Sequence, residues 1–440
     1  MASEPAPIAG DDRIQLLDVT RGVAVLGILL MNITGLGLPY AYDDPTVWGG
    51  ESSADFTMWR LMTLFVEGTM RGLFTLLFGA SIVLFLERHA TGAPQVRPAQ
   101  LYFRRTLWLI AFGLFNGYVL LWSGDVLFYY GIAGLILFFF RNLAPRRLLL
   151  LAALFMILQT LISVSEWQDY REMYASAEAA GARRLAGQPM LDGDREALDA
   201  FSLVQSEFHP PRENLEAHVA DVRESYATAF ASLSHDTRYM QTEFFFRHGL
   251  VECLGMMLLG MGLLKLGVLS GHGSARLYLA MMLIGYALGI GVNFSELRQM
   301  EAEHFSPDAL LRTFMTYDLG RIPMTLGHVG SIALLHQARW MSGASRVLAA
   351  VGRMALTNYL SQSLICLFIF TGAGLAWYGQ LARHELYYVV LAIWAVQLVW
   401  SPVWLHHFRH GPAEWLWRSL TYCRWLPLRR ETAAPVSAAT

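Results

Sequence analysis

The chain has 440 residues, of which 55% are apolar and 15% are charged, and its net charge at pH 7 is −2. An average soluble domain carries about 25% charged residues, so this composition, with its positive mean hydropathy, excludes an ordinary soluble protein. The net charge itself says little about partners. We expect the lipid bilayer and a small-molecule substrate, and no nucleic acid; a homodimer is compatible with the sequence.

Apolar runs recur along the whole chain, and each is close to the roughly 20 residues that cross about 30 Å of hydrocarbon as a helix. This pattern predicts an all-α, polytopic membrane protein with about ten transmembrane helices. The predicted helices cover residues 17–38, 56–87, 101–122, 125–141, 146–163, 243–269, 275–294, 309–338, 345–376 and 386–407.

Basic residues in the connections predict the orientation of these helices. Arginines cluster in alternate connections, whereas residues 39–55 contain four acidic residues and no Lys or Arg. Since Lys and Arg are enriched on the cytoplasmic side of a membrane, both termini are predicted to lie inside. The arginines on that side include Arg88, Arg104, Arg105, Arg141, Arg346 and Arg409.

One connection, residues 164–242, is much longer and more polar than the others and falls on the extracytoplasmic side. Within it, the spacing of Leu215, Val219, Val222 and Tyr226 predicts an amphipathic helix with one apolar stripe. The insert is either a solvated spacer on the membrane surface or a cap over an outward-facing cavity. The predicted organisation is a cytoplasmic tail (1–16), a five-helix bundle (17–163), the insert (164–242), a second five-helix bundle (243–408) and a cytoplasmic tail (409–440).

The stretch FVEGTMRGLFTLLFG places charged residues inside a predicted membrane helix. A charged side chain at mid-bilayer costs about 2.5 to 3.5 kcal/mol, so Glu67 and Arg71 need partners. Their i, i+4 spacing predicts that they share a helix face and neutralise each other. Gly68 and Gly72 form a G-x-x-x-G pattern that lets another helix approach closely. Alone, this segment favours a structural ion pair that joins two helices.

Charged pairs recur on two other predicted helices. Asp318 and Arg321 are spaced i, i+3, and His328 is predicted to continue their stripe. His248 and Glu252 lie one turn apart on another helix. Repetition on separate helices favours a shared polar cavity over isolated ion pairs.

Two amides and one further carboxyl complete the polar set. Asn32 follows Arg21 by eleven residues, and Asn116 follows Arg105 by the same interval. Eleven residues are about three helical turns, so each pair shares a face. Asp125 is predicted at the outer start of its helix.

The predicted topology sorts these residues by depth into two sets. The outer set mixes acid, amide, guanidinium and imidazole groups, as a site for polyhydroxyl substrates or proton transfer would. The inner set is cationic, which suits an anionic ligand such as a coenzyme A phosphate, although arginines on the cytoplasmic side are also ordinary topology signals. The outer set is Asn32, Glu67, Arg71, Asn116, Asp125, His248, Glu252, Asp318 and Arg321, and the inner set includes Asp18, Arg21, Arg105 and Arg353.

Five blocks of this sequence resemble the YeiB-like family of bacterial inner-membrane proteins. They are LLDVTRGVAVLGILLMN, FVEGTMRGLFTLLFGASIVLFLERH, WSGDVLFYYGIAGLILFFFR, VGRMALTNYLSQSLI and HGPAEWLWRSLTY, in family order from residue 16 to 422. The resemblance implies a multi-pass protein of the inner (plasma) membrane with a ten-helix fold. It also implies a C-terminal domain of unknown function at roughly 243–420.

The first helix, with the later LLFGASI, is also similar to the start of the heparan-alpha-glucosaminide N-acetyltransferase group. Those transmembrane acyltransferases are thought to take an acyl group from cytosolic acyl-CoA and deliver it to a sugar outside. An Asn near the end of the first helix and a His in the following loop serve the transfer in that group. Asn32 matches the Asn, whereas residues 33–60 contain no His, so His248 or His328 would supply the imidazole.

The leading hypothesis is a transmembrane acyltransferase-like protein with acyl-CoA as the donor. The alternatives are a transporter of a small polar or anionic solute and a non-catalytic membrane protein. The catalytic candidates are Glu67, Asp125, Asp318, His248 and His328. The substrate-binding candidates are Asn32, Arg71, Asn116, Glu252 and Arg321, and the acyl-CoA-binding candidates are Asp18, Arg21, Arg105 and Arg353.

No metal, haem or nucleotide cofactor is predicted. The sequence contains no Walker loop, no H-E-x-x-H and no G-x-S-x-G motif. The three cysteines have no metal-binding spacing. The sequence therefore gives ATPase, zinc-protease and serine-hydrolase functions no support.

Overall fold

The structure is a computed structural model that describes residues 14–40, 44–50, 52–90, 98–338 and 342–430. It confirms an all-α polytopic membrane protein: the described residues form helices and the turns and loops between them, apart from an isolated bridge between Phe408 and Arg429. Six helices in this part of the chain have the length and apolar composition needed to cross a membrane, and two shorter ones are also apolar. The predicted tails lie outside the described residues over 1–13 and 431–440.

The first part of the chain forms five helices. They are α1 (Gln15–Gly37), α2 (Ser53–Phe65), α3 (Thr69–Ala90), α4 (Pro98–Tyr118) and α5 (Leu127–Leu137), the last extended by a 3-10 turn (Phe138–Phe140). The single helix predicted at 56–87 is wrong, because the chain turns at 66–68 between α2 and α3. Gly68 takes a φ of +64° in this turn, a conformation that glycine adopts at least cost. Glu67 therefore lies in a turn and not within a helix.

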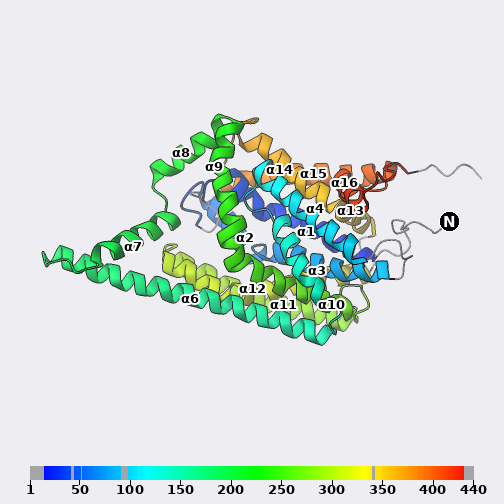
Figure 1. The fold of residues 1–440 in the computed structure, drawn as a ribbon, viewed down its shortest axis with the longest axis horizontal. Helices are drawn as coiled ribbons and strands as arrows, with labels where there is room; N and C mark the ends of the chain where they lie inside the picture. The colour runs from blue at the N-terminus through cyan, green and yellow to red at the C-terminus, as the bar shows by residue number, and fades with distance from the viewer. Residues whose placement is uncertain (1–13, 41–43, 51, 91–97, 339–341, 431–440) are drawn as a thin grey trace, which may run out of the picture.

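The insert begins with the second part of a helix that starts in the first predicted bundle and continues without a break. α6 (Pro145–Leu185) has 41 residues and at 1.5 Å per residue is about 60 Å long, so the boundary predicted at 163/164 falls inside it. The chain then folds back through α7 (Asp194–Phe208), α8 (Arg212–Glu224) and α9 (Tyr226–Tyr239) (Figure 1).

Helix α8 is amphipathic, and its apolar stripe anchors the insert to the body of the protein. Leu215, Val219 and Val222 are buried, as predicted. Tyr226 does not continue the stripe, because Ser225 is extended and caps the start of α9. The Gly372 amide donates a 2.9 Å hydrogen bond to the Val222 carbonyl. Helix α8 is thus docked on the body, whereas the junction of α6 with α7 projects away from it (Figure 1).

In the second part of the chain the first two elements follow one another without a break, and the last element is a short amphipathic helix. The elements are a π-helical segment η3 (Met240–Gly249), α10 (Leu250–Lys265), α11 (Ala275–Ala302), α12 (Pro307–Gln337), α13 (Ser342–Arg353), α14 (Ala355–Phe370), α15 (Arg383–His407) and α16 (Pro412–Tyr422). The single helix predicted at 345–376 is also wrong, because Met354 separates α13 from α14. α12 continues through Pro323.

The two predicted five-helix bundles are packed into one another. Helix α1 packs against α13, α14 and α15, and α10 packs against α3 and α6. The start of α1 and helix α16 lie at one end of the molecule, whereas α7 and α8 lie at the other (Figure 1). This arrangement is what a protein with both termini on one side requires; which side is cytoplasmic stays a prediction.

Candidate functional site

A buried network of ion pairs joins α3, α10 and α12. Arg71 on α3 lies 3.0 Å from the Glu252 carboxylate on α10. Arg321 on α12 lies 2.7 Å from the same carboxylate and 2.5 Å from Asp318. Arg71 also donates a 3.3 Å hydrogen bond to the Tyr317 hydroxyl. The structure thus brings together four predicted outer residues that come from three helices.

This network adds a partner that the sequence did not indicate for Arg71. Glu67 lies in the turn before α3, so the two residues do not share one helix, and Arg71 makes an ion pair across helices with Glu252. A contact between Glu67 and Arg71 stays a prediction. The two glycines do allow a close approach, as predicted. A Cβ at Gly68 would stand 2.3 Å from the Tyr317 hydroxyl, and one at Gly72 would stand 2.9 Å from the Thr325 hydroxyl.

A small outer pocket of about 30 Å³ lies beside this network, between α2, α11 and α12. Its floor is Arg321, whose side chain is 1% exposed. Glu67 lines the pocket, and so does Glu296, a residue that the sequence analysis did not select. Its polar and aromatic lining includes Trp59, Glu67, Asn293, Glu296, Phe314, Tyr317 and Arg321.

Asp125 and Asn116 meet in a second buried cluster. The Asn116 amide donates a 2.8 Å hydrogen bond to Asp125, and the Phe128 amide donates one of the same length. The Tyr359 hydroxyl lies 3.4 Å from the Asp125 carboxylate. The carboxylate therefore accepts hydrogen bonds at the start of α5, which is the typical role of an acidic residue at a helix N-terminus.

The remaining outer candidates do not join the ion-pair network. His248 lies 3.0 Å from Glu166 on α6. His328 lies 3.0 Å from the Tyr286 hydroxyl on α11, on the continuous helix that carries Asp318 and Arg321. Asn32 is half-buried on α1.

The four predicted acyl-CoA-binding residues, Asp18, Arg21, Arg105 and Arg353, all line one inner cavity. The cavity measures about 260 Å³ and is formed by helices α1, α3, α4, α5 and α16 and the junction of α13 with α14. Its wall contains five arginines and two carboxyls, so its charge is positive. The arginines are Arg21, Arg88, Arg105, Arg353 and Arg418, and the carboxyls are Asp18 and Glu414.

Arg105 is held in this cavity by aromatic rings rather than by a carboxylate. Its guanidinium carbon lies 4.1 Å from the ring centre of Trp417 and 4.8 Å from that of Phe85. Within the described residues no carboxylate pairs with Arg105. Arg21, by contrast, is 3.1 Å from Asp18. A guanidinium stacked between rings keeps its N–H groups available for a planar anion.

Glu414 fixes helix α16 against α14 at the edge of the cavity. Its carboxyl accepts hydrogen bonds from the Leu356 amide at 2.6 Å and from the Thr357 hydroxyl at 2.5 Å. Burial raises the pKa of the Glu414 carboxyl, and the hydrogen bonds from Thr357 offset part of that rise. The carboxyl thus keeps its proton to a higher pH than an ordinary glutamate does.

The apolar end of the inner cavity reaches toward the ion-pair network. Phe74 and Tyr130 line that end. The Tyr130 and Thr75 hydroxyls are 2.6 Å apart, and the Thr75 hydroxyl donates a 2.8 Å hydrogen bond to the Arg71 carbonyl. Thr75 on α3 and Tyr130 on α5 therefore lie between the inner cavity and the backbone of Arg71, and we call these two side chains the septum.

Sequence reasoning missed the part of the site that α16 supplies. Trp417 and Arg418 line the cavity, but the segment was assigned to a cytoplasmic tail. The signal was available, because Ala413, Trp417 and Leu420 follow the i, i+4, i+7 spacing of the apolar face of an amphipathic helix. Glu296 was missed because it lies beyond the end of the predicted helix 275–294.

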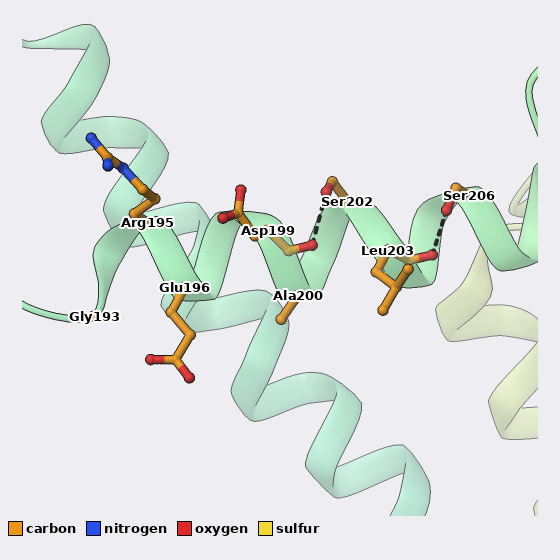
Figure 2. Close-up of a pocket in the computed structure, with 8 residues that line it drawn as sticks. All are labelled: Gly193, Arg195, Glu196, Asp199, Ala200, Ser202, Leu203 and Ser206. Carbon is orange, nitrogen blue, oxygen red and sulfur yellow. Dashed lines mark hydrogen bonds between the residues drawn. The ribbon is translucent and has the colours of Figure 1, made fainter.

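A larger surface depression of about 860 Å³ runs along α7, and a single stretch of chain supplies its lining (Figure 2). All its lining residues come from residues 193–206, and the Ser202 and Ser206 hydroxyls bond to carbonyls of their own helix. Figure 2 shows side chains that diverge from one helix rather than converge on a point. Among the described residues, no group of His, Cys, Asp and Glu has the geometry of a metal site.

The fold and the cavities define a class: an all-α polytopic membrane protein with an arginine-lined cavity at one end and a small pocket of mixed charge toward the other. Residues 263–424 match the family described as "Protein of unknown function (DUF418)". The chain is 30% identical to the Escherichia coli (strain K12) protein "Uncharacterized protein YeiB" over 93% of this chain and 96% of that protein. It belongs to the YeiB-like family.

Two relatives from Bacillus extend the same similarity over nearly the whole chain. "Uncharacterized protein YxaH" of Bacillus subtilis (strain 168) is 28% identical over 97% of this chain and 98% of that protein. "Uncharacterized 39.9 kDa protein in amylase 3'region" of Bacillus acidopullulyticus is 25% identical over 96% and 97%. No solved structure matches.

Proposed function

We propose that this protein is a transmembrane acyltransferase of the bacterial inner membrane that takes its acyl group from cytosolic acyl-CoA and delivers it to an extracytoplasmic hydroxyl or amine. The observation that carries the proposal is the inner cavity, where five arginines face two carboxyls at one end and Phe74, Leu109 and Leu127 line the other. A cavity with arginines at one end and apolar side chains at the other fits a ligand that has phosphates at one end and a thin, uncharged arm at the other.

The size of the cavity decides which part of acyl-CoA it would hold. About 260 Å³ is at the small end of ligand pockets, which typically measure about 300 to 1,000 Å³. The cavity therefore suits the acyl-pantetheine arm, while the phosphates of the nucleotide remain at the arginine-lined mouth. Arg105 and Arg21 would bind phosphate oxygens there, and Trp417 would hold Arg105 in orientation.

The chemistry needs a base on the acceptor side of the septum. The thioester C–S bond breaks, a C–O or C–N bond to the acceptor forms, the acceptor gives up one proton, and the coenzyme leaves as a thiol. Glu67 is the carboxyl best situated to take that proton, because it lines the outer pocket next to the network. Asp318 is bound by Arg321, and Asp125 accepts hydrogen bonds at the start of α5. His248 and His328 contact α6 and α11 instead.

Inverted membrane vesicles test this proposal. Vesicles containing the protein are incubated with acetyl-CoA labelled in the acetyl group, and label is sought on glycans, lipids and small acceptors. The expected result is transfer that disappears with Arg105→Gln and remains with Arg346→Gln, a cytoplasmic-side arginine that does not line the cavity. Absence of transfer, together with unchanged acetyl-CoA, would contradict the proposal.

A transporter is the second candidate, because the inner cavity and the outer pocket lie on either side of a closed septum, as in an alternating-access protein. It predicts movement of a solute without covalent change. Counterflow in proteoliposomes, measured with the same labelled compounds, separates the two functions. Formation of a homodimer stays a prediction.

A further inference from the structure

A ladder of stacked aromatic rings marks the end of α15. The ring centres of Trp400 and Trp404 are 4.8 Å apart, and those of Trp404 and Phe408 are 4.1 Å apart. Tryptophans gather where the hydrocarbon of a bilayer meets its headgroups. The residue after Phe408 is Arg409, which is exposed. We therefore place the end of α15 at the headgroup level of the bilayer.

Residues 424–430, which follow α16, are held against this end of α15. The Arg409 amide donates a 2.9 Å hydrogen bond to the Leu428 carbonyl. The Arg430 amide donates a 3.2 Å hydrogen bond to the His407 carbonyl. These two bonds flank the bridge that closes the segment onto α15. Residues 424–430 therefore lie at the same level as the end of α15.

The indole ring of Trp425 in this segment is held in place but left largely uncovered. It stacks on Trp415 of α16 with the ring centres 5.2 Å apart. Trp415 in turn donates a 2.7 Å hydrogen bond from its indole nitrogen to the Leu426 carbonyl. Trp425 is nevertheless 73% exposed. The bilayer interface is the environment that suits such a ring, because it accommodates both the apolar body of the indole and its N–H group.

The charge of this region is positive. Residues 404–430 contain one carboxyl, Glu414, whose hydrogen bonds go to α14. Arg429 and Arg430 are exposed, and within the described residues neither pairs with a carboxylate. Clusters of four or more basic residues next to a membrane helix typically bind anionic lipid headgroups. The arginines of the region are Arg409, Arg418, Arg424, Arg429 and Arg430.

A phospholipid fits this surface better than a free anion does. Its phosphate offers oxygens to the guanidinium groups of Arg429 and Arg430, and its glycerol and acyl chains offer apolar contact to Trp425. A free phosphate or nucleotide offers the charge alone. Since α15 crosses the membrane directly beside the segment, the leaflet is also the nearest source of such a ligand. An anionic lipid is favoured over a zwitterionic one, because its headgroup carries no cation that repels arginine.

We propose that residues 424–430, together with the end of α15, bind the phosphate groups of anionic phospholipids in the adjoining leaflet. Arg429 and Arg430 donate hydrogen bonds to the phosphate oxygens, and Trp425 inserts between the headgroups. The contact also holds α16, whose Arg418 lines the inner cavity. The lipid thus stabilises one wall of that cavity, whichever ligand the cavity takes.

The test uses the full-length protein in phosphatidylcholine nanodiscs that contain increasing fractions of phosphatidylglycerol. Hydrogen exchange of the backbone amides in α16 and in residues 424–430 is measured together with the melting temperature. Phosphatidylglycerol is expected to slow the exchange of these amides and to raise the melting temperature. In the double variant Arg429→Gln with Arg430→Gln, the phosphatidylglycerol fraction that gives half of the protection is expected to rise at least about fivefold.

Two further variants separate the roles of charge and of the indole. Trp425→Ala is expected to speed exchange in phosphatidylcholine and in phosphatidylglycerol alike, because it removes an apolar contact that both lipids make. Arg346→Gln changes an exposed arginine on α13 and is expected to leave the exchange of α16 and of residues 424–430 unchanged.

Three outcomes would overturn the proposal. They are equal protection by the two lipids, full protection in the double variant, and a loss in Arg346→Gln as large as in the double variant, which would mean that general surface charge attracts the lipid. If the double variant exchanges faster in both lipids alike, the arginines have a structural role instead. If it folds poorly, Arg429→Lys with Arg430→Lys keeps both charges and should retain the dependence on phosphatidylglycerol.

Discussion

The inner cavity and the outer pocket lie at opposite ends of α3 and differ in size and in lining. The cavity next to the end of α3 measures about 260 Å³ and has five arginines against two carboxyls. The pocket at the start of α3 measures about 30 Å³ and is lined by Glu67, Glu296 and Arg321 together with aromatic rings. One helix therefore has a larger cationic cavity at one end and a small pocket of mixed charge at the other. Two sites that differ in this way favour a protein that handles two different ligands over one that passes a single solute.

The largest expected effect concerns Arg321, which lines the outer pocket and belongs to the ion-pair network. Arg321→Gln leaves Glu252 and Asp318 without their shared cation in the interior. Removing one partner of a buried ion pair costs about 3 to 5 kcal/mol, so we expect a large drop in the melting temperature. Arg312→Gln on the same helix removes a partly exposed pair with Asp308 and should cost at most about 1 kcal/mol. Equal losses in the two variants would show that the network is not what stabilises this region.

The second effect separates chemistry from stability within the same pocket. Glu67→Gln is expected to leave the protein folded and to reduce acyl transfer about 100-fold, because general base catalysis typically contributes at least that much. Glu252→Gln, which breaks the ion pairs of Arg71 and Arg321, should instead lower the melting temperature. Transfer rates and thermal unfolding are measured side by side. A Glu67→Gln protein that is merely unstable would assign Glu67 a structural role.

The third effect addresses the inner cavity. Arg105→Gln retains a polar side chain between Phe85 and Trp417 but removes the charge. Loss of one charge-assisted hydrogen bond to phosphate predicts coenzyme A binding weaker by about tenfold or more. Arg346→Gln is the matched control, and an equal effect there would mean that general surface charge attracts coenzyme A.

The helices could be predicted from the sequence because their signal is local. Each of the ten apolar segments is helical in the structure, since a run of about 20 apolar residues has few other ways to satisfy its backbone in lipid. The breaks at 66–68 and at Met354 were missed. Both lie within stretches whose mean hydropathy is apolar despite Glu67 and Arg353, and hydropathy does not record a change of direction.

Residues of the candidate site could be grouped from the sequence only where their predicted depth in the membrane was enough to bring them together. Asp18, Arg21, Arg105 and Arg353 were grouped by depth, and one cavity contains all four. The pairing of Arg71 could not be predicted, because Glu252 is 181 residues away in the sequence. Local spacing could indicate only Glu67, four residues before Arg71. His328 shows the same limit: helical spacing gave its position on α12, but the contact with Tyr286 depends on how α11 packs.

The smallest expected effect is a pH dependence of the stability of the protein, which arises from Glu414 at the edge of the inner cavity. Because burial raises the pKa of this carboxyl above its usual range, about 4.3 for a free glutamate, its neutral form is favoured in the folded protein. The stability that it contributes is complete below that ordinary value and is lost as the pH rises through the raised pKa. Above that point the cavity also gains a negative charge next to its arginines. The melting temperature of the native protein relative to Glu414→Gln should therefore fall as the pH rises from the acid range toward neutrality. The opposite slope would mean that the hydrogen bonds from Thr357 and Leu356 outweigh burial, so that Glu414 is a carboxylate that already compensates one of the five arginines.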